Sequence, residues 1–357
     1  DTAADHGNVL ARVRSLRDAA MGKLAKGVET ADRFRVFNSM SWDREDVVTV
    51  SVPEPGESVF AVSDGQKLPA QVIDRSGGKA EIAVRLRVPS LGAASIEIRK
   101  GESVPAAVRA QGRTLENEFY CIEFNEDGSL GRLFDKRAER EVIPEGETAN
   151  RLQLFQDGPE HEAAWNVHAT YVKREYPWEG AHSVEITERG PVRAVARVTR
   201  SHRDTSLVQD IILHAGLPRL DFRTHVDWHE KQTMLKVAFP VAVHASHATF
   251  EIQFGALERP TRCNTSWDAE KFEVCGQRWA DLSEGGFGVS LLNDCKYGHD
   301  VLGNVLRLTL LRGTEFPDPD ADQGAHDFTY SLLPHRGDWR EGETVRRAAE
   351  LNTPLVA

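Results

Sequence analysis

The sequence predicts a mainly β protein, with one N-terminal helix, a small antiparallel β-sandwich and a large two-sheet β-sandwich. Three observations predict this fold class. Residues 8–29 have a helical hydrophobic period, the period becomes alternating from Phe34 onward, and alternating segments then continue with almost no further helical period. We therefore expect three parts, with boundaries at residues 1–30, 31–103 and 104–357.

The N-terminal helix is predicted from apolar residues three or four positions apart, namely Val9, Val13, Leu16, Ala20 and Leu24. A single amphipathic helix of this length has nothing of its own to pack against. We interpret it as the last helix of a truncated helical bundle whose other members are absent. We expect it to be disordered or to pack on a neighbouring molecule.

The small sandwich is predicted from short alternating segments that Pro and Gly turns separate. In "AEIAVRLRVPSLGAASIEIRK", Ile82, Val84 and Leu86 face one way, whereas Arg85 and Arg87 face the other. The segment "GESVPAAVRAQG" that follows is typical of a linker.

The large sandwich is predicted from longer strands. In "RLDFRTHVDW", apolar or neutral residues from Leu220 to Trp228 alternate with Asp221, Arg223, His225 and Asp227. The segments "PVRAVARVTR", "SLVQDIILH", "LKVAFPVAV" and "NVLRLTLLR" continue the pattern. So many half-buried strands indicate two packed antiparallel sheets.

Composition excludes several classes of function. The net charge of −11 gives no basic surface for nucleic acid, and no run approaches the roughly 18 apolar residues of a membrane span. None of the four cysteines has the CxxC spacing of a structural zinc site, so we expect no metal in this chain. Buried reduced thiols fit a cytoplasmic protein.

Familiar catalytic motifs are also missing. "HEKQT" at 229–233 has Thr233 where a zinc protease needs histidine, and GxGxxG, GxxxxGK[ST] and GxSxG do not occur. Glycine-supported phosphate binding and the usual serine-hydrolase elbow are therefore both unsupported.

Three polar loops remain as candidate binding segments. The strand in "GFGVSLLNDCKYGHD" runs into a group of polar side chains, and "NRLQLFQDGPEHEAAWNVH" and "RGTEFPDPDADQGAHDF" place acids beside aromatic rings. Rings that stack on C–H groups and carboxylates that bind hydroxyls are the usual groups of a sugar site. Solvated loops are the alternative, and the composition of the loops alone does not decide between them.

The chain resembles the α-mannosidases of glycoside hydrolase family 38. The blocks that resemble the family include "RFRVFNSMSWDREDVV", "LENEFYCIEFNEDGSLGRLFDKRAEREVI", "NTSWDAEKFEVCGQRWADLSEGGFGVSLLNDCKYGHDV", "PDPDADQGAHDFTYSLLPH" and "LNTPL". The resemblance covers nearly the whole chain and is strongest to the cytosolic and bacterial branch. It implies that the large sandwich is galactose mutarotase-like, and that the chain is a C-terminal fragment that also lacks the extreme C-terminus.

The resemblance also implies what this chain lacks. Family members hydrolyse terminal α-D-mannose with a retaining mechanism, in an N-terminal barrel that holds a zinc ion and the nucleophile. No block of this chain resembles that barrel, so we assign no catalytic residue to this chain and expect the chain alone to be inactive. The implied partners are a mannosyl oligosaccharide and the parent's own catalytic barrel and helical bundle.

In the family, loops of the large β domain complete the sugar site. We assign that role to Asp157, Trp165, Asp294, Lys296, Tyr297, His299, Asp320, Asp322, Gln323 and His326.

Three alternatives stay open. In the first, the same residues anchor the sandwich to the barrel without touching sugar. In the second, the chain is a stand-alone aldose 1-epimerase that uses a histidine and a glutamate, for which His326, His335 and Glu284 are available. In the third, the chain is a carbohydrate-binding or architectural module.

Overall fold

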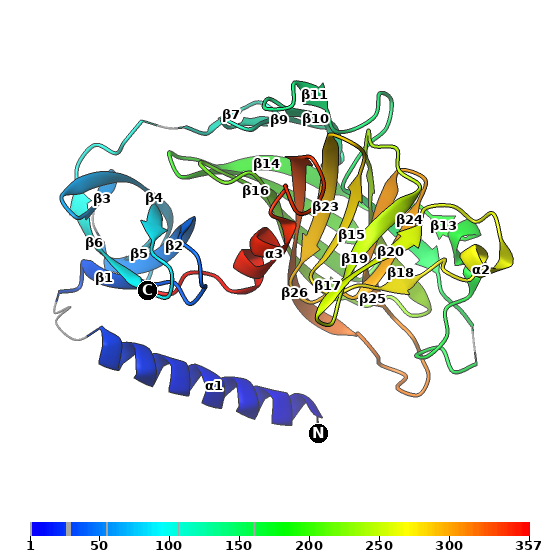
Figure 1. Ribbon diagram of the computed structural model, residues 1–357. Coiled ribbons are helices and arrows are strands. Elements are labelled where there is room, and N and C mark those ends of the chain that lie inside the picture. Colours follow the sequence, from blue (N-terminus) through cyan, green and yellow to red (C-terminus); the bar gives the residue numbers. More distant parts are fainter. Residues whose placement is uncertain (1, 26–29, 55, 106, 160) are drawn as a thin grey trace. The chain divides into compact units, whose positions relative to one another are not determined.

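The computed structural model describes residues 2–25, 30–54, 56–105, 107–159 and 161–357 and divides the chain into two compact units (Figure 1). Unit 1 comprises Asp1–Val104 with Leu355–Ala357, and unit 2 comprises Pro105–Pro354. The predicted fold class is confirmed, because antiparallel strands dominate both units.

The described residues of unit 1 form one helix and six strands. They are α1 (Thr2–Leu24), β1 (Arg33–Phe37), β2 (Arg44–Pro53), β3 (Val59–Ser63), β4 (Gln66–Ser76), β5 (Lys79–Val88) and β6 (Ala93–Lys100).

Helix α1 begins six residues before the predicted start, and the last predicted residues, 26–29, lie outside the described part. Its apolar side chains are exposed, with Val9, Val13, Leu16 and Leu24 between 56% and 65% accessible. Membership of a helical bundle therefore stays a prediction.

The strands of unit 1 pair in the order β1-β6-β3-β4-β5-β2 around a core of their own (Figure 1). The predicted alternation is confirmed in β5, where Ile82, Val84 and Leu86 are buried while Arg87 is exposed. The C-terminal residues join this unit, because Val356 forms an antiparallel bridge with Phe37.

Unit 2 contains three sheets with three short helical segments. The first sheet is formed by β7 (Arg109–Gln111), β8 (Thr114–Glu116), β9 (Tyr120–Phe124), β10 (Leu130–Asp135) and β11 (Arg140–Glu141). The second, with six strands, is formed by β12 (Arg151–Gln156), β13 (Glu175–Tyr176), β18 (Thr233–Pro240), β21 (Val274–Cys275), β24 (Gly298–Leu302) and β25 (Val305–Arg312). The third, with nine strands, is formed by β14 (His182–Arg189), β15 (Arg193–His202), β16 (Thr205–His214), β17 (Leu220–Trp228), β19 (His247–Ile252), β20 (Gly255–Pro260), β22 (Trp279–Ser283), β23 (Phe287–Asn293) and β26 (Gly324–Arg336). The helical segments are η1 (Ala169–Lys173), α2 (Ser266–Ala269) and α3 (Thr344–Asn352).

One continuous core joins the three sheets of unit 2. Strand β17 has the predicted alternation, because its even-numbered residues from Leu220 to Trp228 are fully buried. Phe222 stacks on Tyr330 of the neighbouring β26, with ring centroids 5.0 Å apart. The core therefore holds the strand ends, and the loops that leave them, in fixed places.

Helix α3 is a feature that the sequence analysis missed. It packs on β22 and β23 through Ala348, against Trp279, Leu292 and Leu333. Among the described residues, no helix is both long and apolar enough to cross a membrane.

Candidate functional site

Arg312, the last residue of β25, joins two of the predicted loops. Its Nε lies 2.6 Å from Oδ2 of Asp157, and its backbone N–H donates to Oδ2 of Asp322 at 3.1 Å. The same guanidinium donates to the carbonyl of Asn166 at 2.9 Å. Asp157 is only 6% exposed, so this ion pair fixes loop geometry, and Oδ2 of Asp157 is already bound.

An aromatic ridge lies on these two loops. Trp165 is 67% exposed and packs edge-on against Phe316, with ring centroids 6.2 Å apart. The ring of His161 also stacks on the Phe316 ring, with centroids 5.9 Å apart, and the Ala164 N–H donates to the Phe316 carbonyl at 3.1 Å. Phe316 is itself 47% exposed, so its ring and that of Trp165 both present surface to solvent. Exposed rings of this kind can stack on apolar faces of a ligand.

The third loop, residues 294–297, contacts strand β26, which follows the 315–323 loop in the chain. Its Asp294 accepts a hydrogen bond from the Thr329 N–H at 2.9 Å, which ties the loop to β26. Lys296 is half-buried, with Nζ 4.4 Å from the Phe328 ring centroid. Burial lowers the pKa of Lys296, although nearby carboxylates, including Asp322 and Asp294, oppose that shift. The charge of Asp322 thus acts on Lys296, and we group the three loops under one name, the loop cluster (residues 157–159, 161–166, 294–296 and 315–323).

The remaining polar residues of the segment "RGTEFPDPDADQGAHDF" are held by hydrogen bonds and an ion pair. Gln323 donates to the carbonyl of Glu230 at 3.1 Å, and a ring nitrogen of His326 lies 2.8 Å from the carbonyl oxygen of Asp322. Asp320 is exposed and lies 3.3 Å from Nζ of Lys231. Asp320 and Gln323 thus belong to the loop cluster, whereas His326 follows it in β26.

The structure separates two predicted residues from this group. Tyr297 is 56% exposed and lines a groove beside α3. His299 is not a loop residue: it is the second residue of β24, fully buried, and within the described part neither ring nitrogen has a hydrogen-bond partner. Burial lowers the pKa of His299 to about 3, so the ring is neutral. His299 therefore does not lie with the exposed side chains of the loop cluster.

A buried ion network next to His299 was not anticipated from the sequence. Nζ of Lys236 is fully buried and lies 2.5 Å from Glu273 and 2.8 Å from Asp300. Arg307 pairs with the second oxygen of Asp300 at 2.8 Å, and the Tyr171 hydroxyl donates to Glu273 at 3.1 Å. Burial disfavours the charged ammonium, yet the two carboxylates hold the pKa of Lys236 above its usual value. The network is therefore a charged structural brace of the six-stranded sheet.

The residues that an epimerase would require are engaged elsewhere. Both carboxylate oxygens of Glu284 are bound, one by Arg140 at 2.9 Å and the other by the His244 N–H at 2.9 Å. His335 is 4% exposed, and its Nε2 lies 2.8 Å from Asp281. Within the described residues, moreover, no three His, Cys, Asp or Glu side chains are placed to hold a metal ion.

Sequence reasoning found the loops but missed two residues that organise them. Phe316 lies in the quoted "EFPDPD" segment, where an exposed ring between acids was an available signal. Arg312 gave no such signal, because a basic residue at a strand end is common and its partners lie 10 and 155 positions away.

A large antiparallel sandwich whose loops present exposed rings beside carboxylate and amide groups is typical of proteins that act on carbohydrates. The sequence profile of the glycosyl hydrolases family 38 C-terminal domain matches residues 115–320. The chain therefore belongs to glycosyl hydrolase family 38.

Individual relatives agree with this family. The chain is 36% identical to human alpha-mannosidase 2C1 over 362 aligned positions, which cover 99% of this chain and 32% of the relative. It is 41% identical to alpha-mannosidase G of Dictyostelium discoideum over 67% of this chain and 22% of that protein. An alpha-mannosidase structure from Enterococcus faecalis V583 superimposes with a TM-score of 0.74 at 16% identity, over 96% of this chain and 48% of that one. The chain thus spans about a third of the length of the curated relative it matches over nearly its full length.

Proposed function

We propose that this chain is the non-catalytic β portion of an α-mannosidase that releases terminal α-D-mannose from oligosaccharides. Two relatives that share more than a third of their aligned residues with the chain are named α-mannosidases. The observation that carries the proposal is that Arg312 binds both Asp157 and Asp322 and so joins two of the loops, which leave the rings of Trp165 and Phe316 exposed.

The proposal gives the residues of the loop cluster different tasks. Trp165 and Phe316 offer ring faces to the C–H groups of a sugar. Lys296 and Gln323 bind hydroxyl groups, each with donor hydrogens. Asp157 and Asp322 are positioning residues, because Arg312 holds both.

The bond-breaking groups belong, in this proposal, to the remainder of the same protein. Retaining hydrolysis needs two carboxyl groups about 5–5.5 Å apart, one as nucleophile and one as acid/base. In the loop cluster, Asp157 and Asp322 are engaged by Arg312, and Asp320 lies beside Lys231, so these acids are not free for either role. We therefore expect no hydrolysis by this chain alone.

The zinc ion of the proposal is also assigned to the catalytic barrel. The side chains of the described residues do not fit a metal, since they offer no group of three ligands. A cytoplasmic location and the helical bundle as neighbour of the chain complete the proposal.

The test is the substitution Trp165→Ala in the whole protein, with Trp267→Ala as the matched control. Trp267 is 81% exposed on α2, which is not part of the loop cluster, so both substitutions remove an exposed indole. With a p-nitrophenyl α-mannoside, Trp165→Ala should lower kcat/KM by about two- to tenfold, because a ring contact contributes roughly 0.5–1.5 kcal/mol. Trp267→Ala should leave it unchanged.

Equal kcat/KM values for the two variants and the parent would contradict the assignment of the loop cluster to the sugar site. An equal loss in both variants would also contradict it, because the effect would then come from general destabilisation.

A further inference from the structure

A groove of about 730 Å³ lies beside α3 on unit 2. Its walls are residues 251–256 of the β19–β20 hairpin, residues 277–279, and the side chains of Asn293, Asp294, Tyr297, Trp339, Val345 and Asn352, the last two from α3. We call it the hairpin groove. Its volume falls within the roughly 300–1,000 Å³ of sites that bind small organic ligands.

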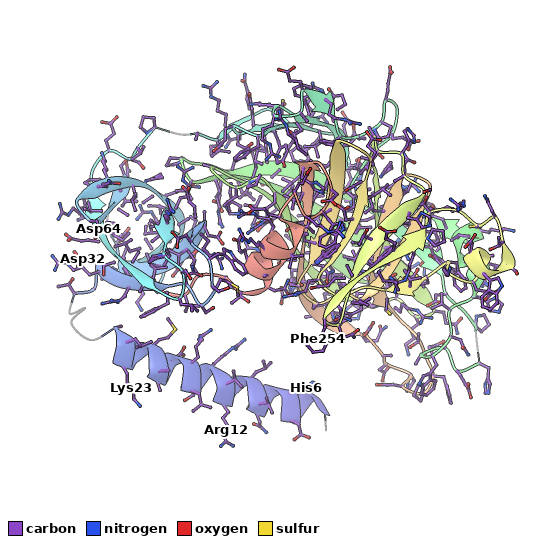
Figure 2. The ribbon with its side chains drawn as sticks, viewed as in Figure 1. His6, Arg12, Lys23, Asp32, Asp64 and Phe254 are labelled. Carbon is purple, nitrogen blue, oxygen red and sulfur yellow. The ribbon has the colours of Figure 1, made fainter. Side chains whose placement is uncertain are left out.

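Aromatic rings are exposed along the hairpin groove. Phe254 is fully exposed at the tip of the hairpin (Figure 2), and Tyr297 is 56% exposed on the 293–297 wall. Trp339 packs on Trp279 at 5.1 Å between ring centroids, and the Arg340 guanidinium lies over the Trp339 ring, 4.1 Å from its centroid. Exposed rings held on rigid elements are suited to stacking on an apolar ligand face.

The polar groups of the hairpin groove are fixed and nearly neutral in sum. Arg278 holds the carboxylate of Glu251 through Nε, at 3.2 and 3.1 Å from its two oxygens. Asn293 donates to the Gln277 carbonyl at 3.0 Å, and Asn352 donates to the Asn293 carbonyl at 2.9 Å. Together with Asp294, the lining of the groove carries two acidic side chains and one basic side chain, so it does not suit a polyanion. A neutral ligand rich in hydroxyl groups fits rings and fixed polar groups together.

The floor of the hairpin groove holds one unsatisfied donor. Trp279 is 1% exposed, and its indole N–H has no hydrogen-bond partner within the described residues. A buried donor without a partner is unfavourable. A ligand oxygen that reaches it would satisfy this donor.

One loop contributes to both the hairpin groove and the loop cluster. Within residues 294–297, Asp294 and Tyr297 line the groove, whereas Lys296 lies over Phe328 of β26. The groove and the loop cluster therefore share a short segment of the chain.

We infer that the hairpin groove is a second subsite, which binds the sugar units of a mannosyl oligosaccharide beyond the unit at the loop cluster. This inference rests on the proposed function for the identity of the ligand. Phe254 and Tyr297 provide the stacking surfaces, and Arg278 and Glu251 provide the polar edge.

The experiment is calorimetric titration of this 357-residue chain with a linear α-linked mannotriose and with methyl α-mannoside. The trisaccharide should bind more tightly than the monosaccharide. Phe254→Asn should weaken trisaccharide binding by about fivefold and leave monosaccharide binding unchanged. Asn suits the left-handed backbone at this position (φ 62°), and Phe254 contributes nothing to the core, so the variant folds. The matched control is Leu302→Ala, which trims an exposed apolar residue at the β24–β25 turn.

The outcomes separate this inference from the proposed function. Binding weakened by Phe254→Asn but not by Trp165→Ala would support the groove and contradict the role of the loop cluster. Binding weakened only by Trp165→Ala would overturn the groove inference and leave the proposed function standing. Two further results would also overturn it: no trisaccharide binding at all, or self-association of the chain that Phe254→Asn abolishes while sugar has no effect.

Discussion

Replacing the buried His299 by leucine should remove a pH-dependent part of the stability of unit 2. Burial disfavours the imidazolium and lowers the pKa of His299 to about 3, with the Lys236 ammonium acting in the same direction. In the unfolded chain the pKa is about 6.5. Between about pH 6.5 and pH 3, the unfolded chain therefore binds a proton at His299 that the folded chain does not bind.

The sign and size of the effect follow from this difference. The stability contributed by neutral His299 is complete above pH 6.5 and is lost progressively as the pH falls toward 3. Each pH unit in that window costs about 1.4 kcal/mol, so about 2 kcal/mol should be lost between pH 7 and pH 5.

The assay is urea unfolding followed by tryptophan fluorescence at pH 7 and pH 5, since six of the seven tryptophans lie in unit 2. His299→Leu should reduce the difference in unfolding free energy between the two pH values by about 2 kcal/mol. His229→Leu is the control, because that ring is 43% exposed and lies 3.0 Å from Asp227. An unchanged pH dependence in His299→Leu would refute the buried, neutral state of this histidine.

Two further predictions use the same unfolding assay at pH 7. Lys236→Met should destabilise unit 2 by roughly 3–5 kcal/mol, because Glu273 and Asp300 keep buried charge without their ammonium. Lys231→Met, at an exposed ion pair, should cost less than about 1 kcal/mol. Equal losses of stability in the Lys236 and Lys231 variants would contradict the role of the buried ion network as a structural brace. Gly128→Ala should cost about 1–3 kcal/mol more than Gly146→Ala, although both glycines have φ near 80°, because only the first Cβ would lie 2.5 Å from Val198. Similar stabilities of the two alanine variants would show that the β9–β10 turn yields to the clash.

The strands were predictable wherever one face is buried. In β17 and β5 the period of two follows directly from burial of alternate side chains, so the sequence states it plainly. Helix α3 was not predictable in this way. It is nine residues long, it buries a threonine, two alanines and a glutamate rather than large apolar residues, and Arg346 and Arg347 interrupt the pattern.

The loops of the candidate site were predictable by composition, but their pairing was not. Asp157 and Asp322 are 165 residues apart, and both are bound by Arg312, whose strand pattern gave no hint of this role. His299 shows the opposite difficulty. It continues a polar run in the sequence, but the strand begins at Gly298, and its register directs the ring into the interior.

The measurement that tests the central claim most directly is hydrolysis of a p-nitrophenyl α-mannoside by this chain alone, with and without added Zn²⁺. If the chain provides loops for a sugar site but no catalytic carboxyl pair, no nitrophenol should be released under either condition. Zinc-dependent release by the chain alone would contradict that claim and would place the nucleophile and its metal within these 357 residues.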